Sequence, residues 1–459
     1  MKFYFFLLLI VMLFSSCSND EITENNLPAI PDEITETTIL ADSIFLNKSL
    51  VNLMVGQNEQ ITYTFQPTNA NEPISWFSYN PEIAVVNNMG LITAISPGRA
   101  KIKAIVGGRY DSFIQVLVST ATTTGAISGS WQNLNNLPSD CARYGSVNFV
   151  IGNKGYIGLG SNIAYIFSYG NVSNLSGQNF SSFKSYDFTS NQWSSIASIP
   201  FGESTTSLAF SINDKAYVGL GGLGNNFWQY DSNSNTWTQL PNFPGLNREN
   251  AVSFSVNGKG YVGLGNQINN MVSDLNDFWE FDPATNTWIQ LSDFPGGSRR
   301  AATAFTIDNK AYVGLGARNN GINGSTVLSD VWSFNANSNT WTQKANMPIA
   351  PDLIHSWAIT GRFSAKAFSI NGKGYVGNGY SVRLLPDFEY YSFKKTTDFW
   401  EYNPINDSWI LKPYSPNISD DTFVFSNSNA GFIGGGKNVT DVPYTTTVAV
   451  NNAFHKLIL

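Results

Sequence analysis

Two stretches decide the fold: Asn257–Gly265, which reads NGKGYVGLG, and Asp277–Pro295, which reads DFWEFDPATNTWIQLSDFP. Both recur with small changes from residue 131 to the C-terminus. The second holds two short apolar runs around a Pro/Asn-rich turn, which is typical of an antiparallel hairpin. Four tryptophan pairs keep a separation of nine residues, which predicts one repeated hairpin register: Trp228 and Trp237, Trp279 and Trp288, Trp332 and Trp341, and Trp400 and Trp409.

The front half of each unit predicts a second hairpin, with a strand, a tight turn and a glycine-rich strand. Its aromatic residue recurs six times, at Tyr156, Tyr217, Tyr261, Tyr312, Tyr375 and Phe432. The outer tryptophan also recurs six times, at Trp131, Trp193, Trp237, Trp288, Trp341 and Trp409. Four antiparallel strands in a unit of roughly 50 residues are typical of a propeller blade. The sequence therefore predicts an all-β fold with a six-bladed propeller over residues 130–459.

The two ends of the repeat array predict how the ring closes. The last unit ends in the degenerate stretch Phe454–Leu457, and the first begins with a lone outer strand around Trp131. We expect the Trp131 strand to complete the last blade beside the C-terminal strands, which leaves no open edge between the two ends.

The repeat resembles the kelch and galactose-oxidase-like propeller family, because it combines glycine-rich second strands with tryptophans at fixed spacing. The oxidases of that family would imply a copper site with two histidines, two tyrosines and a Tyr–Cys crosslink. This chain has only His355, His455, Cys17 and Cys141 to offer, so we expect no metal site, no cofactor and no copper chemistry. No catalytic residue is predicted, because no nucleophile, phosphate-binding or dinucleotide motif occurs.

Residues 42–119 show alternating apolar runs separated by turn residues, which predicts a small β-sandwich. The stretches VGQNEQITYTF and ISWFSYNPEIAVVNNMGLITAISPGRAKIKAIVGG resemble the bacterial immunoglobulin-like (group 2) domain. Such a domain implies a spacer or an adhesion module, and a single copy before the propeller favours the spacer. Residues 120–129 are a small-residue linker.

The N-terminus predicts export and anchoring. Residues 1–17 hold a short apolar run followed by Ser15, Ser16 and Cys17, which resembles a lipoprotein signal peptide with Cys17 as the lipidated residue; a plain secretory signal is the alternative. Residues 18–41 are a polar tether. We expect an outer-membrane lipoprotein attached through its lipid anchor and exposed at the cell surface. The net charge of −7 and the pI of about 5.0 argue against nucleic acid as a partner.

Length variation falls on one face of the predicted ring, in the loops between the second and third strands of the blades and in the connections between blades. Rigid scaffolds with variable loops usually bind ligands there. Long loops of blades five, six and one carry aromatic candidates for sugar stacking or protein contact: Tyr165, Tyr169, Trp357, Tyr390, Tyr391 and Tyr444. The alternative is that these rings only hold the loops down.

An arginine stands thirteen residues before the second-strand aromatic in four units, as Arg143, Arg248, Arg299 and Arg362. At the start of the innermost strand these cations should surround the channel mouth, where guanidinium groups could bind a sugar carboxylate. The alternative is a structural role, with Glu203, Glu249, Asp420 and Asp421 as nearby partners. Blades two and six carry Ser204 and Ser419 at this position.

Two functions follow as hypotheses. The first is a non-catalytic envelope protein whose propeller binds a glycan or a protein. The second is an enzyme similar to the kelch-type N-acetylneuraminate epimerases, which requires an acid/base pair that the sequence does not reveal. A purely structural envelope protein is a third alternative.

Overall fold

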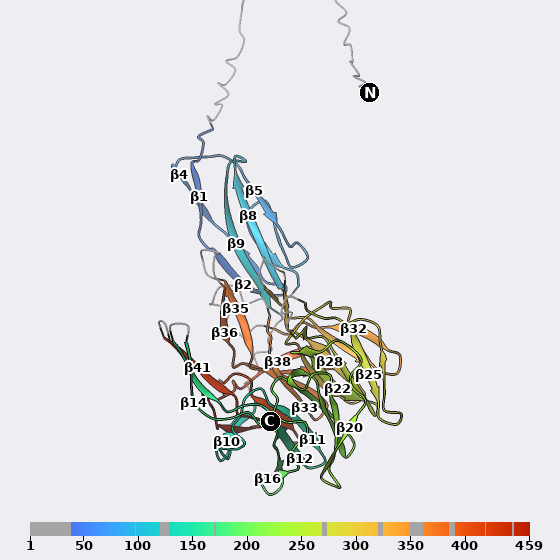
Figure 1. Ribbon diagram of the computed structural model, residues 1–459. Coiled ribbons are helices and arrows are strands. Elements are labelled where there is room, and N and C mark those ends of the chain that lie inside the picture. The colour runs from blue at the N-terminus through green and yellow to red at the C-terminus, as the bar shows by residue number, and fades with distance from the viewer. Residues whose placement is uncertain are drawn as a thin grey trace, which may run out of the picture.

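The computed structural model describes residues 38–96, 98–119, 128–168, 171–268, 273–319, 325–348, 361–384, 391–417, 419–442 and 445–459. These residues form β-strands joined by turns, with one 3-10 turn, η1 (Gly221–Leu223). The predicted all-β class is confirmed (Figure 1). In this described part of the chain, no helix is long and apolar enough to cross a membrane.

The described residues after position 129 contain six four-stranded antiparallel sheets that serve as blades. Blade one is β11 (Val147–Ile151), β12 (Lys154–Gly158), β15 (Phe183–Asp187) and β16 (Gln192–Ile196); blade two is β17 (Leu208–Ile212), β18 (Lys215–Gly219), β19 (Phe227–Asp231) and β20 (Thr236–Leu240). Blade three is β22 (Val252–Val256), β23 (Lys259–Gly263), β25 (Phe278–Asp282) and β26 (Thr287–Gln290); blade four is β27 (Thr303–Ile307), β28 (Lys310–Gly314), β31 (Val331–Asn335) and β32 (Thr340–Lys344). Blade five is β33 (Lys366–Ile370), β34 (Lys373–Gly377), β37 (Phe399–Asn403) and β38 (Ser408–Lys412); blade six is β39 (Phe423–Ser426), β40 (Ala430–Gly434), β43 (Phe454–Ile458) and β10 (Ser130–Asn133).

The innermost strands close a ring. Strands β11, β17, β22, β27, β33 and β39 each contact the next in this order, and β39 contacts β11. Strand β10 pairs with β43, with Trp131 opposite Leu457 and Asn133 opposite His455. The first and last strands of the propeller therefore lie in one sheet, and His455 takes the register position of the third-strand tryptophan.

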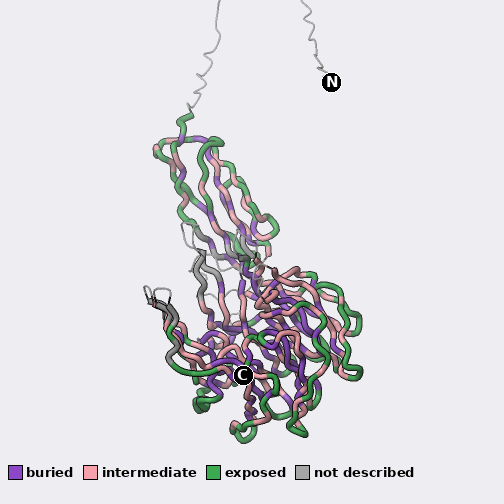
Figure 2. Tube along the Cα trace, viewed as in Figure 1, coloured by how far each residue is buried: buried purple, intermediate pink, exposed green. Residues whose placement is uncertain are grey.

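Contacts between blades explain the repeated glycine and tryptophan. A Cβ on Gly260 of β23 would lie 2.1 Å from the Phe210 ring of the preceding blade, so only glycine fits beside that ring. In three blades the outer tryptophan donates its indole N–H to the carbonyl that follows the previous blade's outer strand: Trp237 to Ala197 at 2.8 Å, Trp409 to Ala345 at 2.9 Å and Trp131 to Pro413 at 2.9 Å. The buried residues accordingly run through the blades, and the exposed ones concentrate at the turns (Figure 2).

The immunoglobulin-like domain packs two sheets and a short ribbon. One sheet has the order β2 (Leu50–Met54), β9 (Tyr110–Ser119), β8 (Gly98–Val106) and β5 (Ile74–Ser78); the other has the order β3 (Asn58–Gln60), β7 (Leu91–Ala94) and β6 (Ala84–Val86). Strand β1 (Ser43–Leu46) pairs with β4 (Tyr63–Gln66). Ile92, Ile102 and Ile114 are fully buried in its core, with Trp76 packed against them.

The long loops form ribbons of their own. The blade-one hairpin β13 (Ala164–Ser168) and β14 (Asn171–Ser176) pairs through β13 with the blade-six hairpin β41 (Lys437–Val442) and β42 (Thr445–Val450). The long loops of blades six and one are thus joined in one sheet. Blade five extends β35 (Tyr380–Leu384) and β36 (Tyr391–Lys395), which reach toward the immunoglobulin-like domain in Figure 1. Two further ribbons are β21 (Arg248–Glu249) with β24 (Asn266–Gln267), and β29 (Ala317–Asn319) with β30 (Ser325–Val327).

Candidate functional site

The four arginines predicted at the channel mouth lie in the protein interior. Arg143, Arg248 and Arg299 are fully buried, and Arg362 is 5% exposed. Arg299 forms a two-pronged ion pair with Asp330, with Nη1–Oδ1 and Nη2–Oδ2 distances of 2.8 Å. It also donates to the carbonyl of Leu315 at 3.0 Å. One guanidinium thus ties the starts of the first and third strands to the end of the second.

We call this arrangement, an arginine before the first strand paired with an aspartate before the third, the bracket. It recurs in blades three and five. Arg248 pairs with both oxygens of Asp277 at 2.7 Å, and Arg362 pairs with Asp398 at 2.5 Å. The acidic partners expected from the sequence were therefore wrong for these blades, because each true partner directly precedes the third strand. These donors are committed to protein groups, which is the arrangement of the structural alternative.

Blade one has the arginine but lacks the carboxylate. Arg143 donates to the carbonyls of Leu159, at 2.9 Å, and Ser182, at 3.0 Å, and to that of Asp140. Ser182 occupies the place that aspartate takes in blades three to five. Burial lowers the pKa of Arg143 to about 10, although the charge of Asp140 opposes the shift.

The aromatic candidates fall largely outside the described residues. Tyr169, Trp357, Tyr390 and Tyr444 lie outside them, as does Cys17. For Tyr391 the structure gives only its backbone place in β36. Tyr165 is partly buried on β13, opposite Val448 of β42. Of this set, only Tyr165 has a described side chain.

A ring of left-handed residues marks the start of the innermost strands, two positions after each arginine or its serine replacement. Its members have φ between 52° and 61°: Gly145, Thr206, Asn250, Ala301, Ser364 and Asp421. Neighbouring members are bonded by backbone N–H to carbonyl contacts from Thr206 to Gly145 at 3.2 Å, from Ala301 to Asn250 at 2.9 Å and from Ser364 to Ala301 at 2.8 Å. Within the described chain, no such bond joins Asp421 to Ser364.

A second set of backbone bonds links the blades just outside this ring. In each of these bonds a glycine N–H donates, at 2.7–2.9 Å, to the carbonyl of the arginine, or of its serine replacement, in the next blade. The pairs are Gly160 with Ser204, Gly265 with Arg299, Gly316 with Arg362 and Gly436 with Arg143. Among the residues that the structure describes, the seam between blades five and six has neither kind of bond, and the same is true between blades two and three. The side chain of Asn378 joins blades five and six instead, by donating to the Asn417 carbonyl at 2.8 Å.

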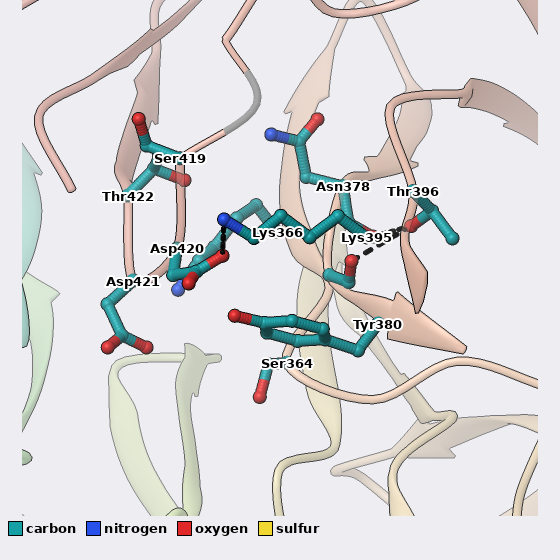
Figure 3. A pocket seen from close by; sticks show the side chains of 11 residues that line it. Ser364, Lys366, Asn378, Tyr380, Lys395, Thr396, Ser419, Asp420, Asp421 and Thr422 are labelled. Carbon is teal, nitrogen blue, oxygen red and sulfur yellow. Dashed lines mark hydrogen bonds and ion pairs between the residues drawn. The ribbon is translucent and has the colours of Figure 1, made fainter. Parts of the chain in front are cut away.

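A small recess that opens to solvent lies at this seam between blades five and six. Blade five contributes one wall and the start of blade six the other, and their side chains face one another (Figure 3). The lining residues are Ser364, Lys366, Asn378, Gly379, Tyr380, Lys395, Thr396, Ser419, Asp420, Asp421 and Thr422.

The two carboxylates of the recess are already paired. Lys395 contacts Asp420 at 3.0 Å, and Lys437 contacts Asp421 at 3.0 Å. Burial, with a hydrogen bond to Asp420 and the charges of both aspartates, raises the pKa of Tyr380. Tyr380 and Asp420 therefore lie near one another at the wall of the recess.

Lys366 is the unexpected cation of the site. It lies opposite Gly377, a register position that the other blades fill with Val147, Leu208, Val252, Thr303 and Phe423. Burial lowers the pKa of Lys366, against the opposing charge of Asp421. Among the described residues it has no ion pair or hydrogen bond. Its signal was present in the sequence, four residues after Arg362, but only a comparison of that column across units reveals it.

The described residues contain no group of three or more His, Cys, Asp or Glu side chains placed to hold a metal ion. The chemistry that the recess offers is therefore that of ammonium, carboxylate, phenol and hydroxyl groups.

Fold and site define a class of protein: an all-β chain with a bacterial immunoglobulin-like domain and a kelch-type propeller. Residues 41–112 match the bacterial Ig-like domain (group 2) family. Residues 200–293, which span blades two and three, match the N-acetylneuraminate epimerase family.

Individual proteins with similar sequences are also N-acetylneuraminate epimerases. N-acetylneuraminate epimerase of Escherichia coli O139:H28 (strain E24377A / ETEC) is 32% identical over 155 residues, which cover 28% of this chain and 39% of that protein. The Shigella flexneri serotype 5b (strain 8401) enzyme is 32% identical over 100 residues, covering 21% and 24%. The chain thus spans at most about two fifths of these relatives' length. The solved structure described as "Structure of YjhT" has a TM-score of 0.52 at 17% identity, over 69% of this chain and 95% of that one, a likeness of fold.

Proposed function

We propose that the propeller binds sugars of the N-acetylneuraminate type and interconverts their anomers. The observation that carries the proposal is the match of residues 200–293 to the N-acetylneuraminate epimerase family. The recess between blades five and six supports it, because the recess is lined by groups suited to a polyhydroxylated ligand.

Anomer exchange needs two proton transfers and no net redox change. The anomeric hydroxyl loses its proton, the ring oxygen gains one, and the ring opens to a carbonyl; closure on the other face reverses both steps. Tyr380 and Asp420 suit this work, because a phenol and a carboxylate that line the same recess can give a proton to a bound sugar and take one from it. In this proposal Asp420 takes the proton and Tyr380 supplies one, with Lys395 keeping the carboxylate in place.

The test uses one crystallised anomer of N-acetylneuraminate, dissolved with the purified protein and followed by proton NMR. We expect faster equilibration than in buffer, and at least a tenfold loss of that acceleration in Asp420→Asn and Tyr380→Phe, the range of general acid–base catalysis. Lys154→Met, on the exposed start of β12, serves as the control and should leave the rate unchanged. Binding without acceleration would contradict the enzyme and favour a non-catalytic glycan receptor.

We also propose that Cys17 carries the lipid that attaches the chain to the outer membrane. The support is the sequence itself, with a short apolar run and small residues before the cysteine. Mass spectrometry of the N-terminal peptide should show a diacylglyceryl cysteine, and Cys17→Ser should release the protein from the membrane fraction. An unmodified cysteine in the mature protein would contradict this.

A further inference from the structure

We propose that the recess between blades five and six is a carboxylate subsite in which Lys366 forms the ion pair with an acidic sugar. The proposal deepens the proposed function, on which the identity of the sugar rests. The chemistry of the subsite rests on the recess alone.

The first argument is the position of Lys366. Five other blades place Val, Leu, Val, Thr or Phe opposite the same second-strand glycine. A lysine there brings an ammonium group into a packing position that the repeat otherwise fills almost entirely with apolar side chains. Such a substitution costs stability unless the charge is used.

The second argument is the pairing of charges. Lys395 is paired with Asp420, and Lys437 with Asp421. Lys366 remains as the ammonium of the recess without an ion pair in the described chain. Asp421 acts on Lys366 through its charge, but the two form no ion pair in the described chain. A partly buried ammonium in this position can bind an anion that completes a salt bridge. Among common sugar groups, the carboxylate supplies that charge.

The third argument is a pair of unsatisfied polar atoms in the same lining. Asn378 and Thr422 are each 3% exposed. Asn378 Oδ1 and Thr422 Oγ1 have no hydrogen-bond partner within the described protein. Buried polar atoms are usually satisfied, so two orphans beside one unpaired cation point to a ligand. Thr422 can donate to a carboxylate oxygen, and Asn378 Oδ1 can accept from a sugar hydroxyl or amide N–H.

The arginines cannot take this role in the same arrangement. Arg362, the arginine of blade five, is bonded to Asp398 and to the carbonyl of Asn378 at 3.2 Å. In this proposal the cation that recognises the sugar is therefore Lys366, four residues after Arg362 in the chain, and not one of the four arginines that the sequence suggested.

Binding should also be linked to pH. The charged and titratable groups around Lys366 are Asp420, Asp421, Lys395, Lys437 and Tyr380. A bound carboxylate favours the ammonium form, so the Lys366 pKa is higher in the complex than in the free protein. Binding therefore takes up protons, and affinity falls as the pH rises through the lysine's free-state pKa.

The experiment measures binding of N-acetylneuraminate and of glucuronate to the full chain by titration calorimetry. The wild type is compared with Lys366→Met and Lys366→Arg, and Lys154→Met serves as the control. Each acid is compared with its methyl ester, which keeps the hydroxyls but removes the charge. We expect a loss of about tenfold or more for Lys366→Met with the acids, the same loss for the esters with wild type, and no acid–ester difference in Lys366→Met. Titrations in buffers of different ionisation enthalpy should show proton uptake.

Three outcomes would overturn the subsite: equal acid binding by wild type and Lys366→Met, equal binding of acid and ester by the wild type, or no binding of either acid. Thermal unfolding of Lys366→Met checks that the variant folds, and its melting temperature should not fall. Anomer exchange distinguishes the two proposals. Accelerated exchange that Lys366→Met leaves unchanged contradicts the subsite, whereas Lys366-dependent binding without exchange contradicts the enzyme.

Discussion

The Arg299–Asp330 bracket gives the sharpest test of what holds the propeller together. Asp330 accepts from both Nη atoms of Arg299 at 2.8 Å and from the indole of Trp332 at 2.8 Å. Asp330→Ala removes all three of these hydrogen bonds and leaves a fully buried guanidinium. Breaking a buried pair from one side costs about 3–5 kcal/mol. We expect the lower end, because the Asp330 side chain is 20% exposed and Arg299 keeps its bond to the Leu315 carbonyl.

Blade one provides an independent scale for this cost. Arg143 is buried without a carboxylate, and its pKa falls from 12.5 to about 10, which corresponds to about 3 kcal/mol. A carboxylate at the position of Ser182 would relieve a penalty of this order. Removing the corresponding carboxylate of blade four, Asp330, should therefore create a similar penalty. Ser182→Ala is the matched control. It deletes only the 3.4 Å contact in which the Ser182 hydroxyl accepts from Arg143 Nη2, so it should lower the free energy of unfolding by less than about 1 kcal/mol.

The assay is urea unfolding followed by tryptophan fluorescence, which reports mainly on the propeller because eleven of the 12 tryptophans follow residue 130. Arg299→Met with Asp330→Ala should cost clearly less than the sum of the single changes, because the double variant leaves no buried charge. A cost below about 1 kcal/mol for Asp330→Ala, or costs that add within about 0.5 kcal/mol, would refute the bracket as a stabilising pair.

Three further predictions follow from packing, burial and titration. Gly260→Ala should lower the free energy of unfolding by about 1–3 kcal/mol, because the new Cβ would overlap the Phe210 ring. Adding Phe210→Leu to that variant should recover part of the lost stability. Burial raises the pKa of Cys141 to about 12, so in a chain whose other cysteine is serine, a thiol reagent at neutral pH should label it only after unfolding; rapid native labelling would contradict its burial. Burial opposes the ionised form of Asp277, but the hydrogen bond and charge of Arg248 prevail and lower its pKa. Its stabilising contribution is therefore present above about pH 4 and lost below it, and urea unfolding of Asp277→Asn should show a shallower acid decline.

The propeller could be predicted because its information is local and repeated. A tryptophan pair nine residues apart fixes a hairpin, and the hairpin in the structure has that register, with Phe281 opposite Trp288. Because the pattern occurs in six copies, the fold can be predicted even where one copy is irregular. The degenerate unit that ends in His455 still adopts the strand that its place in the array requires.

The arginines show where such reasoning stops. Their recurrence was visible, but their partners lie 29 to 36 residues away, at the start of the third strand. Asp277, Asp330 and Asp398 stand directly before a Phe-Trp or Val-Trp pair, and reading the two columns together would have revealed the bracket. The recess was harder still to predict from the sequence, because Lys366 and Asp421 belong to different blades and only the closed ring brings them together.

The position that opens each innermost strand explains why the recess lies where it does. Four blades fill it with arginine, which ties three strands of its own sheet. In blade two the η1 turn packs on Ser204 instead, since a Cβ on Gly222 would lie 2.7 Å from the serine hydroxyl. In blade six Ser419 joins a network of amides, accepting from Asn451 at 2.6 Å and donating to Asn438 at 2.7 Å. At the seam between blades five and six, the Asn378 side chain takes the place of the backbone bonds found at four of the six seams. This departure from the repeat leaves the propeller fold intact, and it brings Lys366 to the recess where we propose that the sugar carboxylate binds.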